Sequence, residues 1–159
     1  MRILGIDPGL EITGYGCVGR EKTDVGLIEA GVIRTKKSDP LPRRLSVLYE
    51  SLVELLGEVR PEVIAIEELY SHYKFPRTSI IMGHARGVVL LAAGLQDITV
   101  ISYGANRIKK SLTGNGHASK EQMQLMVKNV LNLEKVPKPP DVSDAIAVAL
   151  CHANVLEHM

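Results

Sequence analysis

The sequence predicts an α/β domain with a five-stranded mixed sheet and helices on both faces. Three strand-like segments come first and read as a meander, and two further apolar strands follow, separated by a helix. The chain has 159 residues, of which 45% are hydrophobic, and this length suits one domain over residues 1–159 with a substantial core. Aromatic residues make up only 4%, so aliphatic side chains must fill that core.

The predicted strands differ in how they expose their side chains. RILGID is apolar on both faces, as expected of a central strand, and ITGYGCVGR and VGLIEAGVIRT complete the meander with it. A helix is predicted over residues 41–58, where leucines recur every three or four positions and Pro42 lies near the first turn. EVIAIEE follows as a fourth strand, again apolar on both faces until Glu67.

The second half is predicted to contain four helices and one strand, which follows the first of these helices. LYSHYKFPRTS reads as a polar loop, followed by a helix over residues 79–93 that ends at Gly94. ITVISYG is the fifth strand, and a short helix is expected over residues 106–112 before the turn TGNGHAS. Ser119 and Gln122 form a capping box for KEQMQLMVKNVL. A proline-rich loop, NLEKVPKPPD, precedes the last helix, over residues 141–156.

Composition favours a soluble cytoplasmic protein. No signal peptide or membrane-spanning run is evident, and the two cysteines lack C-x-x-C spacing, which indicates reduced thiols. The net charge of +1 excludes a bulk polycation. Basic residues nevertheless cluster in RTKKSDPLPRR and NRIKK, which are either solvated faces or anion-binding patches.

Acidic residues lie at the ends of three predicted apolar segments, at positions that could meet at one edge of the sheet. Asp7 ends the first strand, and Glu67 ends the fourth, which should run parallel to the first. Asp141 and Asp144 are three residues apart at the start of the last helix and share one of its faces. Glu68 is rejected because it points to the opposite face of its strand from Glu67.

Three of the four acids, Asp7, Asp141 and Asp144, also have an ordinary structural explanation. Asp-Pro-Gly is a common turn tripeptide, and acids in a first helical turn complement the helix dipole. Four clustered carboxylates would, however, repel one another and be costly without cations. Divalent metal resolves the conflict, because hard oxygen ligands suit Mg²⁺ or Mn²⁺, and two such ions can drive phosphodiester hydrolysis.

The chain resembles the RuvC family of crossover (Holliday) junction endodeoxyribonucleases. The segments that match are ILGIDPGLEITGYG, AIEELY, GHARGVVLLAA, TGNGHASKEQMQLMV and PPDVSDAIAVALCHA, in the family's order over nearly the whole chain. The resemblance implies a ribonuclease-H-like fold and a Mg²⁺-dependent homodimer, with Mn²⁺ as a substitute and two ions per site. It also implies paired nicks in four-way DNA junctions and partnership with the RuvA–RuvB branch-migration complex.

The resemblance assigns roles to individual residues. The acidic site of the family falls on Asp7, Glu67, Asp141 and Asp144, although some members place His at the position of Asp141. The residues that match DNA-contacting positions are Tyr70, Arg77, Lys109 and Lys120. Tyr70 matches an aromatic that contacts bases, and the two lysines match residues near the scissile phosphate. A tyrosine that only covers its own loop is the alternative for Tyr70.

Two other functions share some of these features. GIDPG also begins ATPases and sugar kinases, but those need a second lobe for which 159 residues leave no room. A module that binds branched DNA without cutting it would not need four intact acids.

The segment SIIMGHARGVVLLAAGL is apolar nearly all round, which predicts a helix buried on two sides. Either the helix is covered entirely by its own domain, or a second subunit covers one side and makes a two-fold dimer. Val89 and Ala92 are candidates for the outward side.

Overall fold

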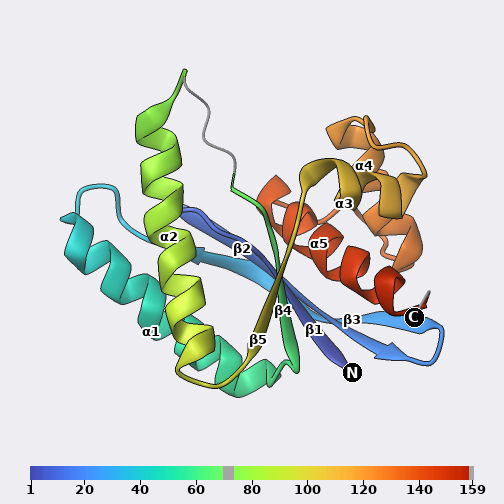
Figure 1. Ribbon diagram of the computed structural model, residues 1–159, viewed down its shortest axis with the longest axis horizontal. Coiled ribbons are helices and arrows are strands. Elements are labelled where there is room, and N and C mark those ends of the chain that lie inside the picture. The colour runs from blue at the N-terminus through green and yellow to red at the C-terminus, as the bar shows by residue number, and fades with distance from the viewer. Residues whose placement is uncertain (70–73, 158–159) are drawn as a thin grey trace.

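A sheet of five strands separates two layers of helices in the computed structural model, which describes residues 1–69 and 74–157 (Figure 1). Its strands lie in the order β3-β2-β1-β4-β5. They are β1 (Arg2–Asp7), β2 (Ile12–Glu21), β3 (Asp24–Arg34), β4 (Val63–Glu67) and β5 (Thr99–Tyr103). The first three are antiparallel, whereas β4 runs parallel to both β1 and β5. The predicted mixed sheet is therefore confirmed.

The two faces of the sheet pack against different helices. Helices α1 (Leu41–Val59) and α2 (Pro76–Gly94) cover one face. The other is covered by α3 (Ala105–Thr113), α4 (Lys120–Val130) and α5 (Pro140–Glu157) (Figure 1). Because side chains alternate along a strand, Leu4 and Ile6 of β1 enter the first core and Ile3 enters the second. This alternation explains why β1 and β4 are apolar on both faces.

Helix α5 lies directly on β1 and β2 because glycines face it. A Cβ atom at Gly5 would lie 1.8 Å from the carbonyl oxygen of Ala145, and one at Gly14 would lie 2.1 Å from that of Asp141. At Gly16 it would lie 2.3 Å from the side chain of Ile146. Any larger residue would push the helix away, so these glycines set the depth at which α5 sits.

Helix α2 begins earlier than the sequence suggested. The loop expected to extend to Ser79 ends at Phe75, and Pro76 occupies the first turn of the helix. Proline suits that position because its fixed φ matches the helix and no partner for an N–H is needed there. Arg77 is therefore helical. Gly94 is the last residue of α2, and the left-handed conformation occurs instead at Asp97 (φ 54°).

The capping box of α4 is confirmed. The side chain of Ser119 accepts a hydrogen bond from the backbone N–H of Gln122, whose side chain accepts one from the backbone of Ser119. Both cysteines are buried and free. Among the helices in the described ranges, none has the combination of length and hydropathy that crossing a bilayer requires.

Candidate active site

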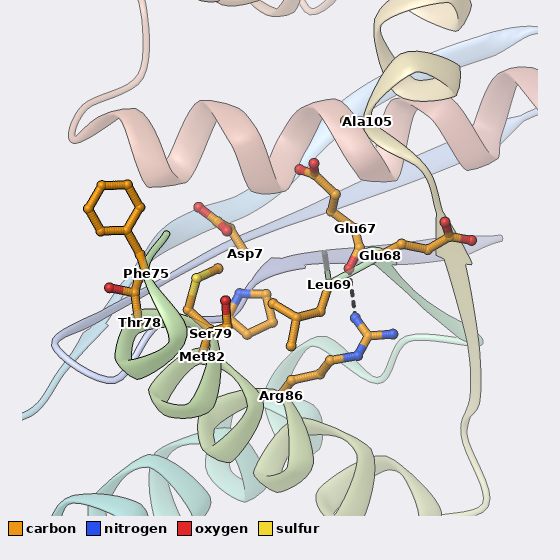
Figure 2. A pocket seen from close by; sticks show the side chains of 11 residues that line it. Asp7, Glu67, Glu68, Leu69, Phe75, Thr78, Ser79, Met82, Arg86 and Ala105 are labelled. Atoms are coloured by element: carbon orange, nitrogen blue, oxygen red, sulfur yellow. Dashed lines mark hydrogen bonds between the residues drawn. The ribbon is translucent and has the colours of Figure 1, made fainter. Parts of the chain in front are cut away.

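Asp7 and Glu67 end two neighbouring strands. Ile6 pairs with Ile66 in the parallel β1–β4 register, so the next residue on each strand is one of the two acids. Adjacent strands lie about 4.8 Å apart, which brings the two strand ends close together. The alternation along each strand places both acids on the α5 side, and Figure 2 shows their side chains pointing away from α2.

The N-terminal turn of α5 brings two more acids to the same edge. Asp7 pairs with Gly14 across β1 and β2, and Gly14 lies directly under Asp141. Asp144 follows one turn later on the same face of the helix. The start of α5 is held in place because Ser143 donates a hydrogen bond to the carbonyl oxygen of Pro137 at 3.0 Å.

The pKa of Asp7 is raised by its burial and by the other acids of this edge. Burial is the largest cause that raises the pKa of Asp7, to about 7, and Asp144, Asp141 and Glu67 raise it further in that order. Lys120 acts in the opposite direction. Four acids from three separate elements therefore form one electrostatic unit, which we call the acidic cluster (Asp7, Glu67, Asp141 and Asp144).

Two lysines partly compensate the acidic cluster. Burial raises the pKa of Glu67 and that of Asp144, while Lys120 lowers both and Lys109 lowers that of Glu67. The Nζ atom of Lys120 lies 3.3 Å from an oxygen of Asp144. Both lysines line a 210 Å³ cavity together with Glu67 and Asp144. The structure thus brings both sequence-predicted lysines to the acidic cluster.

The donor set suits a hard divalent cation in type and in charge. Carboxylate oxygens are the ligands that Mg²⁺ and Mn²⁺ prefer, and a bound cation would relieve the repulsion that adds to the effect of burial on the pKa of Asp7. In their present positions the side chains do not close around one point. Across residues 1–69 and 74–157, no three His, Cys, Asp or Glu side chains are arranged to hold a metal ion. A complete metal site at these acids stays a prediction.

A cavity of 660 Å³ separates the acidic cluster from α2 (Figure 2). Asp7 and Glu67 lie on one wall, and apolar side chains of Leu69, Phe75 and Met82 lie on the other. Sequence alone does not predict this apolar wall. Leu69 and Phe75 are single apolar residues in a predicted loop, and Met82 lies on a helix that is apolar nearly all round, so neither pattern marks the side that faces the acids. Figure 2 shows Glu68 pointing away from Asp7, as expected.

The remaining predicted DNA contacts lie apart from the cluster or outside the described residues. Arg77 is exposed in the first turn of α2 and is not among the described residues that line the two cavities beside the acids. Tyr70 falls in the segment 70–73, which lies outside the described residues.

Sequence reasoning also missed Arg86, which lies on α2 and whose guanidinium donates a hydrogen bond to the backbone oxygen of Glu67 (Figure 2). Its partner is a backbone atom, so no pattern of side-chain types reveals the contact.

Comparison with known proteins gives consistent matches over almost the whole chain. A family model described as crossover junction endodeoxyribonuclease RuvC matches residues 3–152. The enzyme of that name from Rhodopirellula baltica is 51% identical over 149 residues, covering 94% of this chain and 84% of the relative. The enzyme from Alkaliphilus metalliredigens is 44% identical over 154 residues, covering 97% and 93%.

Solved structures agree with the sequence relatives. T. thermophilus RuvC in complex with a Holliday junction substrate superposes with a TM-score of 0.92 at 34% identity, covering 99% of this chain and 96% of the other. The yeast mitochondrial Holliday junction resolvase has a TM-score of 0.69 at 15% identity, covering 96% and 77%, and shares the fold. The expected ribonuclease-H-like fold is thereby confirmed.

Proposed function

Because this chain belongs to the RuvC family of crossover junction endodeoxyribonucleases, we infer that it hydrolyses phosphodiester bonds in four-way (Holliday) DNA junctions during recombination and repair. We propose that the acidic cluster is its active site. The observation that supports this most strongly is the convergence of Asp7, Glu67, Asp141 and Asp144 on one sheet edge, where burial and then the neighbouring carboxylates raise the pKa of Asp7 to about 7.

The acidic cluster would hold Mg²⁺, for which Mn²⁺ can substitute, and two ions per site are proposed. When bound, such ions would activate a water molecule and stabilise the leaving oxygen. The side chains of this chain have a separate task. Asp7 and Glu67 must lose their protons to bind a cation, and the rigid strand ends fix their positions relative to the scissile phosphate.

Lys109 and Lys120 are proposed to bind the phosphate beside the bond that breaks. Both lie next to the carboxylates, and Lys120 already forms an ion pair with Asp144. An ammonium group at this place stabilises the negative charge that develops on the phosphate oxygens. Arg77, which is exposed at the start of α2, is proposed to contact the DNA backbone farther from the cut.

Tyr70 is proposed to stack on an unpaired base of the junction. It follows Glu67 by only three residues in the sequence. Stacking of a base on an aromatic side chain contributes about 1–3 kcal/mol without requiring a particular sequence.

We further propose that two copies form a symmetric dimer through α2. Large apolar side chains remain exposed on this helix and on the residue after it, and they are Ile80, Ile81, Leu90, Leu91 and Leu95. A two-fold dimer would cover them and present two identical acidic clusters to two like strands, which yields paired symmetric nicks. On the strength of the family resemblance, the RuvA–RuvB complex is the proposed partner and the cytoplasm the proposed compartment.

A direct assay tests the proposed function. An end-labelled four-way junction is incubated with the protein and Mg²⁺, and a linear duplex of the same sequence serves as the control. We expect metal-dependent nicks at matching positions in two opposed strands of the junction and none in the duplex. Equal cutting of both substrates would contradict junction specificity, and no cutting at all would contradict the nuclease assignment.

A further inference from the structure

Arg86 connects α2 to the strand end from which Glu67 projects. One guanidinium nitrogen donates a hydrogen bond to the backbone oxygen of Glu67 at 2.6 Å (Figure 2). Another donates to the hydroxyl oxygen of Ser102 at 2.8 Å. Glu67 is the last residue of β4, and Ser102 lies on the neighbouring strand β5. A single side chain therefore ties a helix to two parallel strands at the edge of the acidic cluster.

The contact lies where β4 loses its pairing with β1 on one side and keeps only β5 on the other. On one side, the β1–β4 pairing ends at Ile6 and Ile66, one residue before Glu67. On the other side, Glu67 pairs with Tyr103, and the backbone N–H of Glu68 donates to the oxygen of Tyr103 at 2.9 Å. The bond from Arg86 adds a restraint at Glu67 from outside the sheet. Such a restraint limits rotation of the peptide that follows the Glu67 side chain.

The effect of Arg86 on Glu67 is geometric. The cations that lower the pKa of the Glu67 carboxyl are Lys109 and Lys120, both on the α5 side of the sheet. Arg86 approaches from the α2 side and binds a backbone oxygen, while the carboxylate points away from α2 (Figure 2). Arginine suits this bridge because its planar fork reaches two acceptors at once, which a lysine ammonium does not reproduce.

We propose that Arg86 is a positioning residue that holds the end of β4 so that the Glu67 carboxylate faces the acidic cluster. The inference rests on the proposed function, because it assumes that Glu67 binds the catalytic metal. Groups that orient metal ligands typically change metal affinity or activity by about 10–100-fold when they are removed. Arg86 itself touches neither metal nor substrate in this account.

The test measures metal affinity without DNA. Mn²⁺ is titrated calorimetrically into the wild-type protein and into Arg86→Gln and Arg86→Lys variants. We expect Arg86→Gln to weaken Mn²⁺ binding roughly 10–100-fold and to slow single-turnover cleavage similarly, with a less than about threefold change in junction Kd. Arg86→Lys should stay closer to Arg86→Gln than to wild type. Wild-type Mn²⁺ affinity in Arg86→Gln would overturn the proposal, and full recovery in Arg86→Lys would show that charge alone suffices and overturn it too.

Arg2→Gln is the matched control for a purely structural role. Arg2 also donates from its guanidinium to a backbone oxygen, that of Val59 at 2.8 Å, but it lies at the opposite end of β1 from Asp7. Thermal unfolding is recorded for each variant. We expect Arg2→Gln to lower the melting temperature about as much as Arg86→Gln while leaving Mn²⁺ affinity unchanged. An equal loss of Mn²⁺ affinity in both would mean that the effect follows stability, which contradicts positioning.

Glu67→Gln separates this proposal from the proposed function. If Glu67→Gln binds Mn²⁺ and cuts junctions like wild type, the active-site assignment fails regardless of Arg86. If Glu67→Gln loses both and Arg86→Gln loses neither, only the positioning role fails.

Discussion

The pKa of Asp7 is shifted more than those of Glu67 and Asp144, and this shift makes the free-energy cost of placing Asp7 in the acidic cluster measurable. Its pKa rises from 3.8 to about 7, chiefly through burial and then through Asp144, Asp141 and Glu67. Between about pH 4 and pH 7 the unfolded chain therefore releases this proton while the folded chain retains it. Without metal, the free energy of unfolding should fall as pH rises through this window and level off above it.

Asp7→Asn removes that pH dependence. We expect the metal-free variant to be more stable than wild type above pH 7, by at most about 4 kcal/mol, and to differ little near pH 4. Urea unfolding of wild type and variant at pH 4, 6 and 8 without metal measures the free energy of unfolding at each pH. The free energy of unfolding of Asp7→Asn should still fall slightly as pH rises, because the pKa values of Glu67 and Asp144 are also raised. A variant less stable than wild type at pH 8 would contradict the repulsion argument.

Lys109 and Lys120 should affect the reaction through phosphate binding. Lys109→Ala and Lys120→Ala are expected to slow cleavage or to lower the salt dependence of junction binding by about one unit of slope each. Fluorescence anisotropy at several salt concentrations gives the slope, and single-turnover assays give the rate. Lys128→Ala, at the far end of α4 from Lys120, is the control and should change neither. Wild-type rate and slope in both variants would exclude the proposed role.

At the level of residues, sequence alone predicts functional side chains whose chemical type and place in the pattern are informative, such as acids at the ends of apolar segments. The four acids were predictable because Asp7 and Glu67 end apolar strands, while Asp141 and Asp144 begin an apolar helix. Strand pairing then brings Asp7 beside Glu67. Arg86 was not predictable, because its bond to a backbone oxygen depends on where α2 lies relative to β4. The pKa of Asp7 likewise depends on burial and distance, which spacing along the chain does not give.

Among the elements, α5 determines whether the acidic cluster forms. It delivers two of the four acids, and its depth on the sheet depends on glycines that face it, including Gly14. Gly14→Ala would place a Cβ atom 2.1 Å from the carbonyl oxygen of Asp141 and 2.9 Å from its Cβ atom, so the start of α5 must move. Displacements of about 1 Å in an active site can cost 100-fold in rate.

We therefore expect Gly14→Ala to lose about 1–3 kcal/mol of stability and at least about tenfold in cleavage rate. Gly26→Ala is the control, because a Cβ atom there meets nothing within 4 Å. Chemical unfolding and single-turnover cleavage provide the two measurements. Full activity in Gly14→Ala would show that the position of α5 tolerates more than the packing indicates.

Sequence patterns predicted the order and type of the ten elements found in residues 1–69 and 74–157, and the one misassigned boundary has a physical reason. The polar, aromatic-bearing segment LYSHYKFPRTS predicts a loop that lasts to Ser79. Proline is, however, favourable in the first turn of a helix, and α2 begins at Pro76. A proline in the local sequence is compatible with either the end or the start of a helix, so Pro76 alone did not fix where α2 begins.

At the scale of the whole molecule, α2 has one face in the core and one exposed. Val89 and Ala92, the two sequence-based candidates for the outward side, are each only 1% exposed and pack in the core shared with α1. That choice was wrong, because a helix that is apolar all round has no periodicity that marks its outer face. Leu91 is 54% exposed and Ile80 is 60% exposed, so these residues belong to the proposed interface.

Leu91→Arg should separate the subunits while the fold survives. Sedimentation at micromolar concentration is expected to show a wild-type dimer and a monomeric Leu91→Arg variant with unchanged circular dichroism. Val89→Arg is the contrasting variant, since a charge placed in the core should unfold the protein. A monomeric wild type that still makes paired nicks would contradict the symmetric dimer.

The central claim is that the acidic cluster performs the chemistry and other residues bind the DNA. The most direct test compares junction binding with junction cleavage for Asp7→Asn, which keeps the shape of the side chain and removes its charge. At saturating Mg²⁺ we expect no detectable nicks, with a junction Kd within about threefold of wild type, because basic residues make the phosphate contacts. Cleavage by Asp7→Asn at the wild-type rate would contradict the account.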